Sequence, residues 1–210
     1  MKKRAAIILI TLLGVGVSCQ KQPKASFTVS KSECYVGETV SLISSSTDAS
    51  SYKWTIDNVS SGNNSSLNYT PTSAGTKIIK LDGISKNGKK TDDDTKTLLV
   101  KNINEAFKGT YKYSGDVNSF CASEKLTINT NGNNQISCDI DGTVLTAIVN
   151  SLTNATFVSY SETDTDGIIT SVNGSLTLNG DIITSILNYS FIDTNTGITT
   201  PISCTSIFVK

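Results

Sequence analysis

The chain has 210 residues, with 18 lysines and arginines against 18 aspartates and glutamates, and it contains no histidine. The lack of histidine removes the commonest general base and the commonest transition-metal ligand, which argues against most hydrolase and zinc-site chemistry. Three of the 18 basic residues are Lys2, Lys3 and Arg4, so the rest of the chain carries 15 basic against 18 acidic residues, a net charge of −3. A chain without a basic excess offers no patch for a polyanion, and we predict no nucleic-acid partner.

The first 19 residues have the pattern of an export signal. The basic segment Lys2–Arg4 precedes an apolar run, Ala5–Val17, which as a helix would span about 20 Å and so falls short of a bilayer core of about 30 Å. The segment Gly16–Cys19 reads Gly-Val-Ser-Cys and resembles the lipobox of bacterial lipoproteins. The resemblance implies that residues 1–18 are a signal peptide. It also implies that Cys19 becomes the N-terminus, carries a diacylglyceryl lipid with palmitate-type chains, and attaches the protein to a membrane.

Residues 19–25 are predicted to form a polar tether, because they show neither strand nor helix periodicity. In Bacteroidota lipoproteins an acidic run after the cysteine accompanies display on the cell surface, whereas this tether is basic. We therefore expect a lipid-anchored protein of the cell envelope, at the outer membrane. The choice between its periplasmic and surface faces stays open.

Removal of residues 1–18 from the 210 leaves 192, which is enough for two small domains with their own cores. Short β-branched runs are frequent, and no segment sustains a 3.6-residue periodicity. The sequence therefore predicts an all-β protein, with one domain at residues 26–101 and a second at 102–210.

Alternating apolar and polar residues open the first domain in the runs 26–30, 38–44 and 51–57. One face of these runs is apolar and consists of Phe27, Val29, Val40, Leu42, Tyr52, Trp54 and Ile56. Turn signals separate such runs at residues 36–37, 61–64 and 87–88. This spacing is typical of an antiparallel sandwich, in which the apolar faces pack against each other.

Several of these segments resemble a PKD domain, an immunoglobulin-like sandwich common in bacterial envelope proteins. The matching segments are Val36–Val40, Tyr52–Trp54, Ala74–Thr76 and Asn87-Gly88. The resemblance implies the fold of the first domain and no particular ligand.

Two features of the first domain invite functional interpretations. Trp54 could stack on a carbohydrate, but it lies in mid-strand between Tyr52 and Ile56, and we predict that it belongs to the core. Asp92-Asp93-Asp94 could help to hold a calcium ion through carboxylate oxygens. Three consecutive acids before an edge strand are more typical of a solvated turn, and we predict that turn and no metal site.

The second domain begins after a short connector with the strand pattern of residues 107–114. Further apolar runs follow, and turn dipeptides that favour tight hairpins lie between them: Asn131-Gly132, Asp141-Gly142, Asp166-Gly167 and Asn179-Gly180. About eight strands joined mostly by short turns predict an antiparallel meander that closes into a barrel or packs as a sandwich. An irregularity is expected at Asn173-Gly174. With its opening Gly109-Thr-Tyr111 strand, the domain resembles the lipocalin-like or calycin-like β domains of Bacteroidota lipoproteins.

Acidic residues in the second domain fall on predicted turns. Glu162, Asp164 and Asp166 alternate before Gly167, as in a calcium loop, but an EF-hand would place an acid where this chain has Asn173. We interpret the segment as a hairpin tip, with weak calcium binding as the alternative, and residues 193–197 in the same way. Neither a nucleophile elbow nor a phosphate-binding glycine loop occurs, and we predict no cofactor, no metal and no catalytic residue.

Four cysteines remain after Cys19, and they allow three complete pairings. Closure of the meander makes its first and last strands neighbours, so we predict a disulfide between Cys121 and Cys204. Cys138 alternates with apolar residues and is interpreted as a small buried side chain, and Cys34 is expected to be free as well.

Three functions from different classes fit these features. The first is a binding or structural module whose second domain contacts a protein or a glycan through loops at the barrel end, near Asp141-Gly142, Asp166-Gly167 and Asn179-Gly180. The second is a lipocalin-like carrier with a small apolar ligand inside the barrel. The third is an enzyme. We favour the non-catalytic module.

Overall fold

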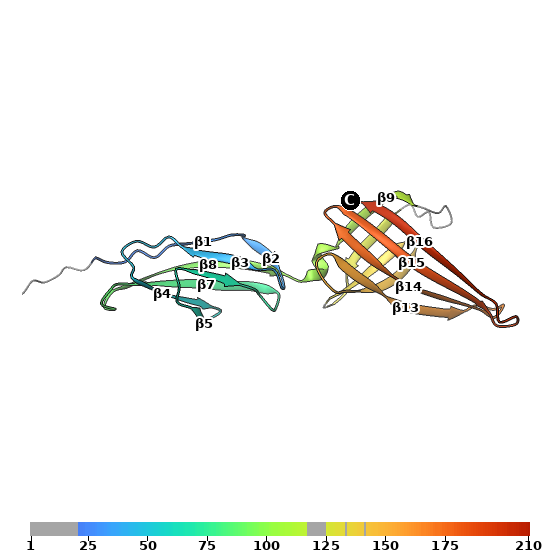
Figure 1. The fold of residues 1–210 in the computed structure, drawn as a ribbon, viewed down its shortest axis with the longest axis horizontal. Helices are drawn as coiled ribbons and strands as arrows, with labels where there is room; N and C mark the ends of the chain where they lie inside the picture. The colour runs from blue at the N-terminus through green and yellow to red at the C-terminus, as the bar shows by residue number, and fades with distance from the viewer. Residues whose placement is uncertain (1–20, 117–124, 133, 141) are drawn as a thin grey trace, which may run out of the picture.

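The computed structural model describes residues 21–116, 125–132, 134–140 and 142–210. Almost every element is a strand, and one short 3₁₀ helix, η1 (Ile103–Ala106), joins two groups of strands, so the all-β prediction is confirmed (Figure 1). Among these described residues no helix has the length and apolar character that a membrane crossing requires. Cys19, Cys121 and Asp141 lie outside the described residues.

The first group of strands forms two sheets. The first sheet has three strands in the order β1 (Phe27–Val29), β3 (Val40–Ser44) and β6 (Ser66–Tyr69). The second has five strands in the order β2 (Glu33–Tyr35), β8 (Thr91–Lys101), β7 (Gly75–Ile84), β4 (Ser51–Ile56) and β5 (Val59–Gly62). All neighbours are antiparallel except β2 and β8, which run parallel.

The core of this sandwich lies between the two sheets, as the period-two pattern predicts. Phe27 of β1 and Trp54 of β4 are fully buried, and their rings meet edge to face with centroids 5.1 Å apart. The indole Nε1 of Trp54 donates a hydrogen bond to the carbonyl oxygen of Asn64 at 2.8 Å. The prediction of a core tryptophan is therefore confirmed, and its polar N–H is satisfied within the sandwich.

The prediction of a turn at Asp92–Asp94 is wrong, because all three residues belong to the long strand β8. Asp92 Oδ2 accepts a hydrogen bond from the backbone N–H of Ala25 at 2.8 Å, and Asp94 Oδ2 accepts one from that of Phe27 at 3.2 Å. The intervening Asp93 forms an ion pair with Lys80 at 3.6 Å. Side chains alternate along a strand, so two of the acids attach the entering chain to the second sheet while the third lies on the opposite face.

The turn predicted at residues 61–64 begins too early. Ser61 and Gly62 belong to β5, and the preceding hairpin turns at Asp57 and Asn58, whose φ angles are 49° and 66°. Aspartate and asparagine are the non-glycine residues that best tolerate these left-handed angles.

The second group of eight strands forms a closed antiparallel barrel, which confirms the predicted meander. In chain order the strands are β9 (Gly109–Asp116), β10 (Lys125–Thr130), β11 (Gln135–Ile140), β12 (Thr143–Val149), β13 (Asn154–Thr163), β14 (Ile168–Asn179), β15 (Ile182–Asp193) and β16 (Thr199–Val209). β16 closes the barrel by pairing with β9 from Ser206 to Val209. Buried side chains fill the interior, the largest being Tyr111, Phe107, Phe208, Leu126, Ile128 and Ile136.

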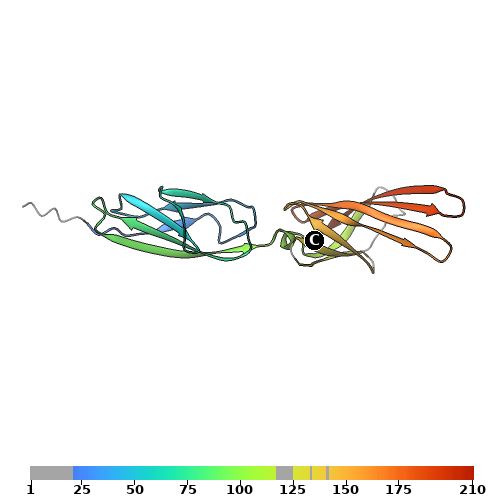
Figure 2. The same ribbon diagram turned by 90° about the horizontal axis from the view of Figure 1, so that it is seen from below.

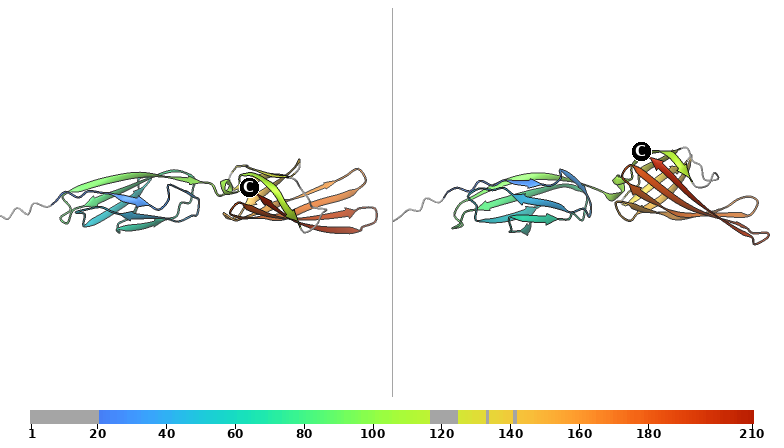
Figure 3. Two further views of the ribbon diagram at one scale, coloured as in Figure 1. Left: turned by 90° about the horizontal axis from the view of Figure 1, so that it is seen from above. Right: turned by 45° about the horizontal axis from the view of Figure 1, so that its top comes forward.

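Figures 1, 2 and 3 show the sandwich and the barrel in line, with η1 between them. Asn104 of η1 donates from Nδ2 to the carbonyl oxygens of Gly132 and Gln135, at 2.8 and 3.0 Å, and so attaches the connector to a barrel turn. The described chain starts at the sandwich end away from the barrel (Figure 1). The domain boundaries at residues 26–101 and 102–210 stay a prediction that separate expression of the two segments would test.

The turns of the meander alternate between the two ends of the barrel. The β14–β15 turn at Asn179-Gly180 lies at the end near the sandwich, where Lys210 donates its backbone N–H to the carbonyl oxygen of Asp181 at 2.9 Å. Asp166-Gly167 lies at the opposite end. The prediction that both turns belong to one recognition surface is therefore wrong, because successive turns of an antiparallel meander lie at opposite ends of the strand between them.

Candidate functional site

The strands β13 to β16 extend beyond the rest of the barrel. They contain 10 to 12 residues, whereas β9 to β12 contain 6 to 8. Figure 1 shows their hairpins projecting at the end of the barrel away from the sandwich. The four long strands thus continue as a sheet, which we call the arm: residues 158–163, 168–173, 188–193 and 199–203.

The arm begins where β13 leaves the barrel wall. β12 and β13 pair only from Ala147–Phe157 to Val149–Ala155, and the β13–β14 register shifts between Phe157 and Tyr160. A β-bulge of this kind bends a strand and increases its twist. The irregularity predicted at Asn173-Gly174 has its counterpart here, since the shift lies in the partner strand opposite these residues.

The strand registers align the side chains of the arm in rows. A row with three buried side chains, Phe157, Leu187 and Cys204, closes the barrel core, and Gly174 lies in the same register. The next two rows on the same side of the sheet continue out of the core, the first with Tyr160, Val172, Tyr189 and Ile202, the second with Glu162, Thr170, Phe191 and Thr200. We call these eight side chains the distal face.

Aromatic rings dominate the distal face. The rings of Tyr189 and Phe191 have centroids 6.2 Å apart and planes within 9° of parallel, and both side chains are partly exposed. Burial raises the pKa of the Tyr189 hydroxyl. Tyr160, 46% exposed, donates a hydrogen bond from its hydroxyl to Glu162, and this contact raises the pKa of Tyr160. The face therefore combines a flat apolar surface with a polar border that carries the Glu162 carboxylate.

Threonine hydroxyls flank the outer ring of the distal face. Thr170 of β14 and Thr200 of β16 are the direct cross-strand neighbours of Phe191. Directly opposed positions in an antiparallel pair hold their Cβ atoms about 5 Å apart, so both hydroxyls lie beside the ring. Each hydroxyl can donate one hydrogen bond and accept two.

The two hairpin tips of the arm are joined to each other. Thr194 Oγ1 donates to the carbonyl oxygen of Gly167 at 2.7 Å, and Asn195 Nδ2 donates to that of Asp166 at 3.4 Å. These contacts link the β13–β14 hairpin to the β15–β16 hairpin. The arm is thus supported at its far end as well as at the barrel.

The acids at these tips serve the turns. Asp164 Oδ1 accepts the backbone N–H groups of Asp166 and Ile168 at 2.9 and 2.8 Å, and Asp193 Oδ1 accepts that of Asn195 at 2.8 Å. The bond from Asn195 lowers the pKa of Asp193. Both segments are hairpin tips, as predicted. In the part of the chain that the structure describes, no group of three or more Cys, Asp or Glu side chains is arranged to hold a metal ion.

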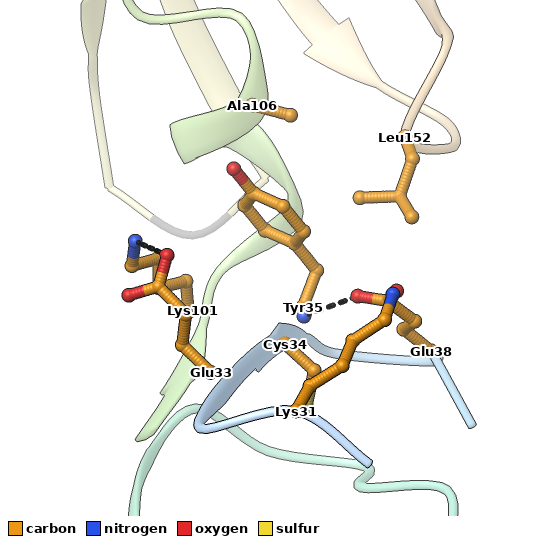
Figure 4. Close-up of a pocket in the computed structure, with 8 residues that line it drawn as sticks. All are labelled: Lys31, Glu33, Cys34, Tyr35, Glu38, Lys101, Ala106 and Leu152. Carbon is orange, nitrogen blue, oxygen red and sulfur yellow. Dashed lines mark hydrogen bonds and ion pairs between the residues drawn. The ribbon is translucent and has the colours of Figure 1, made fainter. Parts of the chain in front are cut away.

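Apart from the distal face, a hollow of about 300 Å³ lies where the sandwich meets the barrel. Figure 4 shows Tyr35 of β2 pointing toward Ala106 of η1, with Leu152 of the β12–β13 turn nearby. The remaining lining residues are Lys31, Glu33, Cys34, Glu38 and Lys101.

The charges of this junction pocket are already paired. Lys101 Nζ lies 2.7 Å from Glu33 Oε1, and Lys31 forms an ion pair with Glu38 that lowers the pKa of the glutamate. Glu38 Oε2 also accepts the backbone N–H of Tyr35 at 3.1 Å. Because both lysines are ion-paired with glutamates, the described lining of the pocket has no unpaired charge for a ligand. Its contacts hold the residues of the junction in place.

The free cysteines agree with the sequence interpretation. Cys34 and Cys138 are buried and unpaired, and burial raises the pKa of Cys138 to about 12. The pairing of β9 with β16 confirms the strand adjacency on which the disulfide prediction rests. The Cys121–Cys204 bond itself stays a prediction, since Cys121 lies outside the described residues.

No protein-family model matches this chain, and no match was found among curated proteins. Two solved structures are similar at a low level. One belongs to a study of the promiscuous specificity of carbohydrate-binding modules from the β-sandwich superfamily; it is 15% identical, with 90% of this chain and 92% of that chain covered and a TM-score of 0.38. The other is the β-glucuronidase of Parabacteroides merdae with glycerol in its active site, 10% identical, with 86% and 24% covered and a TM-score of 0.30. Similarity at this level defines neither a family nor a function.

Proposed function

We propose that this protein is a non-catalytic binding module of the cell envelope, anchored through lipid on Cys19, that recognises a glycan on its distal face. The observation that supports this most is the pair of parallel rings, Tyr189 and Phe191, with threonine hydroxyls beside Phe191. A sugar ring has an apolar C–H side that packs on an aromatic ring, and hydroxyls at its edge that exchange hydrogen bonds with neighbouring polar groups.

The rigidity of the arm favours recognition of a bulky, polar ligand. Tyr189 and Phe191 lie on a strand paired on both sides, and the linked hairpin tips limit the movement of that strand. A binding surface that is formed before the ligand arrives loses less conformational entropy on binding. A glycan therefore meets an ordered surface.

The interior of the barrel supports a surface module over a carrier. The described part of the interior is occupied by buried apolar side chains, including Tyr111, Phe157 and Phe208. A small-molecule carrier needs that space for its ligand. Glu162 on the distal face accepts a hydrogen bond from a tyrosine hydroxyl, and Asp164 and Asp193 at the hairpin tips accept backbone N–H groups. These structural contacts support a non-catalytic role.

The distal face is tested with a glycan array probed by the soluble protein from Gln20 onward, followed by calorimetry with the best oligosaccharide. We expect Phe191→Ala and Tyr189→Ala to weaken binding at least ten-fold, because each removes a stacking surface. Ile186→Ala is the matched control, since Ile186 lies on the same strand, faces the other side of the sheet and is 39% exposed. Binding that survives both aromatic substitutions would contradict the proposal.

The anchor is tested separately by mass spectrometry of the protein extracted from membranes. We expect the mature chain to begin at Cys19 with acyl chains attached, and Cys19→Ser to release the protein from the membrane fraction. A soluble, unacylated form that begins at another residue would refute the lipidation.

A further inference from the structure

The barrel wall has an opening between β12 and β13. The two strands separate beyond the Ala147–Phe157 pair, so residues 143–146 of β12 and 158–163 of β13 have no ladder partner on their facing sides among the described residues. These unpaired stretches lie on the side of the Ala147–Phe157 pair that faces the end of the barrel with the arm.

Hydrogen bonds near the turns fix which backbone groups face this opening. Asn150 donates its N–H to Asn154 across the β12–β13 turn, at 2.9 Å, so Thr146 and Val144 also direct their N–H and C=O groups toward β13. Asp164 donates its N–H toward β14, to Ile168 at 3.0 Å. By the same alternation, Ser161 and Thr163 direct theirs away from β14 and into the opening.

A small pocket of about 150 Å³ lies in the opening and is lined from both strands. Its walls are Val144, Leu145, Thr146, Val158, Ser159 and Tyr160. Val144 is 64% exposed and Val158 45% exposed, so apolar surface borders the unpaired backbone. The volume is that of a single side chain, which suits a residue inserted from a partner.

The two strand edges lack the residues that usually protect an exposed strand from pairing with another chain. Residues 143–146 and 158–163 contain no lysine and no proline, and Glu162 is their single charged residue. Proteins commonly place lysine or proline on such edges to prevent pairing with another chain. The backbone N–H and C=O groups of these edges instead alternate as donors and acceptors, which complements the backbone of another extended polypeptide.

We propose that the opening between β12 and β13 binds an extended peptide of another protein, which adds a strand to the barrel wall. The added strand hydrogen-bonds to Ser161 and Thr163 on one side and to Val144 and Thr146 on the other. One of its apolar side chains fills the pocket between the strands. The peptide would use the β13 edge, whereas the glycan is proposed to stack on Tyr189 and Phe191 of β15; Tyr160 borders both sites.

The test uses amide hydrogen exchange, measured by NMR, on the protein from Gln20 onward. The probe is a capped peptide of alternating threonine and valine with a lysine at each end. We expect the amides of Val144, Thr146, Ser161 and Thr163 to exchange at least ten-fold more slowly with the peptide. No slowing at millimolar peptide would overturn the proposal, and slowing that rises with protein concentration without peptide would assign the edges to self-association instead.

Two variants make the test specific. Ser161→Pro removes an amide that faces the opening while keeping the amides that pair with β14, and Val158→Lys adds a charge beside the pocket. Each should weaken peptide binding at least ten-fold by fluorescence anisotropy. Ile182→Lys, which adds the same charge on an outer position of β15 that is 43% exposed, should leave it unchanged. If a circular dichroism spectrum shows that Val158→Lys is folded and both edge variants still bind the peptide as the native protein does, this site is refuted.

Discussion

A Cβ atom added to Gly174 in β14 would lie 2.0 Å from the carbonyl oxygen of Ile186 in β15. Gly174 belongs to the row that closes the barrel core, and the distal face begins two residues away on β14, at Val172. Only glycine fits such an approach, because any side chain would have to displace a main-chain carbonyl.

Gly174→Ala is expected to lower the free energy of unfolding by about 1 to 3 kcal/mol, since overpacking forces the two strands apart. Urea denaturation followed by circular dichroism measures the change. Gly115→Ala is the control, because a Cβ there meets nothing within 4 Å, and it should change stability by no more than about 0.5 kcal/mol. Equal effects of the two substitutions would contradict the close approach.

Asp94→Ala is expected to destabilise the sandwich by about 1 to 2 kcal/mol, because it leaves the Phe27 N–H without its carboxylate acceptor. Asp93→Ala removes an acid one residue away whose ion pair with Lys80 is exposed, and it should cost at most about 0.5 kcal/mol. Thermal unfolding of both variants separates the two roles. A larger loss for Asp93→Ala would show that the attachment of β1 does not depend on Asp94.

The buried thiol of Cys138 should make stability fall at alkaline pH. Burial raises its pKa from 9.0 to about 12, so between these values the unfolded chain loses the thiol proton while the folded chain keeps it. The stabilisation is complete below pH 9 and is lost as the pH rises toward 12, by at most about 1.4 kcal/mol per pH unit. Unfolding measured from pH 8 to 11 should show a steeper decline for the native protein than for Cys138→Ala. Parallel declines would exclude this contribution.

Peptide mapping without reduction is expected to find Cys121 joined to Cys204, with Cys34 and Cys138 as free thiols. The bond would close a loop of roughly 80 residues and stabilise the barrel by about 4 to 5 kcal/mol on a chain-entropy basis. Recovery of Cys204 with Cys138 would contradict the prediction. Labelling by iodoacetamide should reach Cys34 and Cys138 only after unfolding, because both are buried.

Local patterns in the sequence were enough to predict much of the fold. The alternation around Trp54 indicates a strand with one buried face, and that residue is fully buried. Asp166-Gly167 and Asn179-Gly180 specify tight turns, and both lie between paired strands. These features depend on neighbouring residues alone, and the sequence carries that information directly.

The sequence could not reveal features that depend on distant partners. The parallel pairing of β2 with β8 joins residues more than 60 positions apart. Asp92–Asp94 belong to a strand because they pair with Leu81–Gly83 of β7. The rows of the distal face likewise come from registers across four strands. The sequence did contain one signal for an aromatic face, since Tyr189 and Phe191 lie two positions apart on one strand and therefore on the same side of it. Which side of the sheet that is depends on how the strand pairs in the barrel.

For the anchorage through Cys19 proposed above, β8 lies on the path of force between the anchor and the barrel. Its first residue, Thr91, accepts a hydrogen bond from Gln22 of the entering chain, and its last, Lys101, leads through η1 into the barrel. A pull between tether and barrel therefore runs along this strand and loads its ladders with β7 and β2 in shear. Bonds loaded in shear have to break together, whereas bonds pulled open at a hairpin end break one after another. We therefore expect the sandwich to keep its length under load and to transmit the force to the barrel.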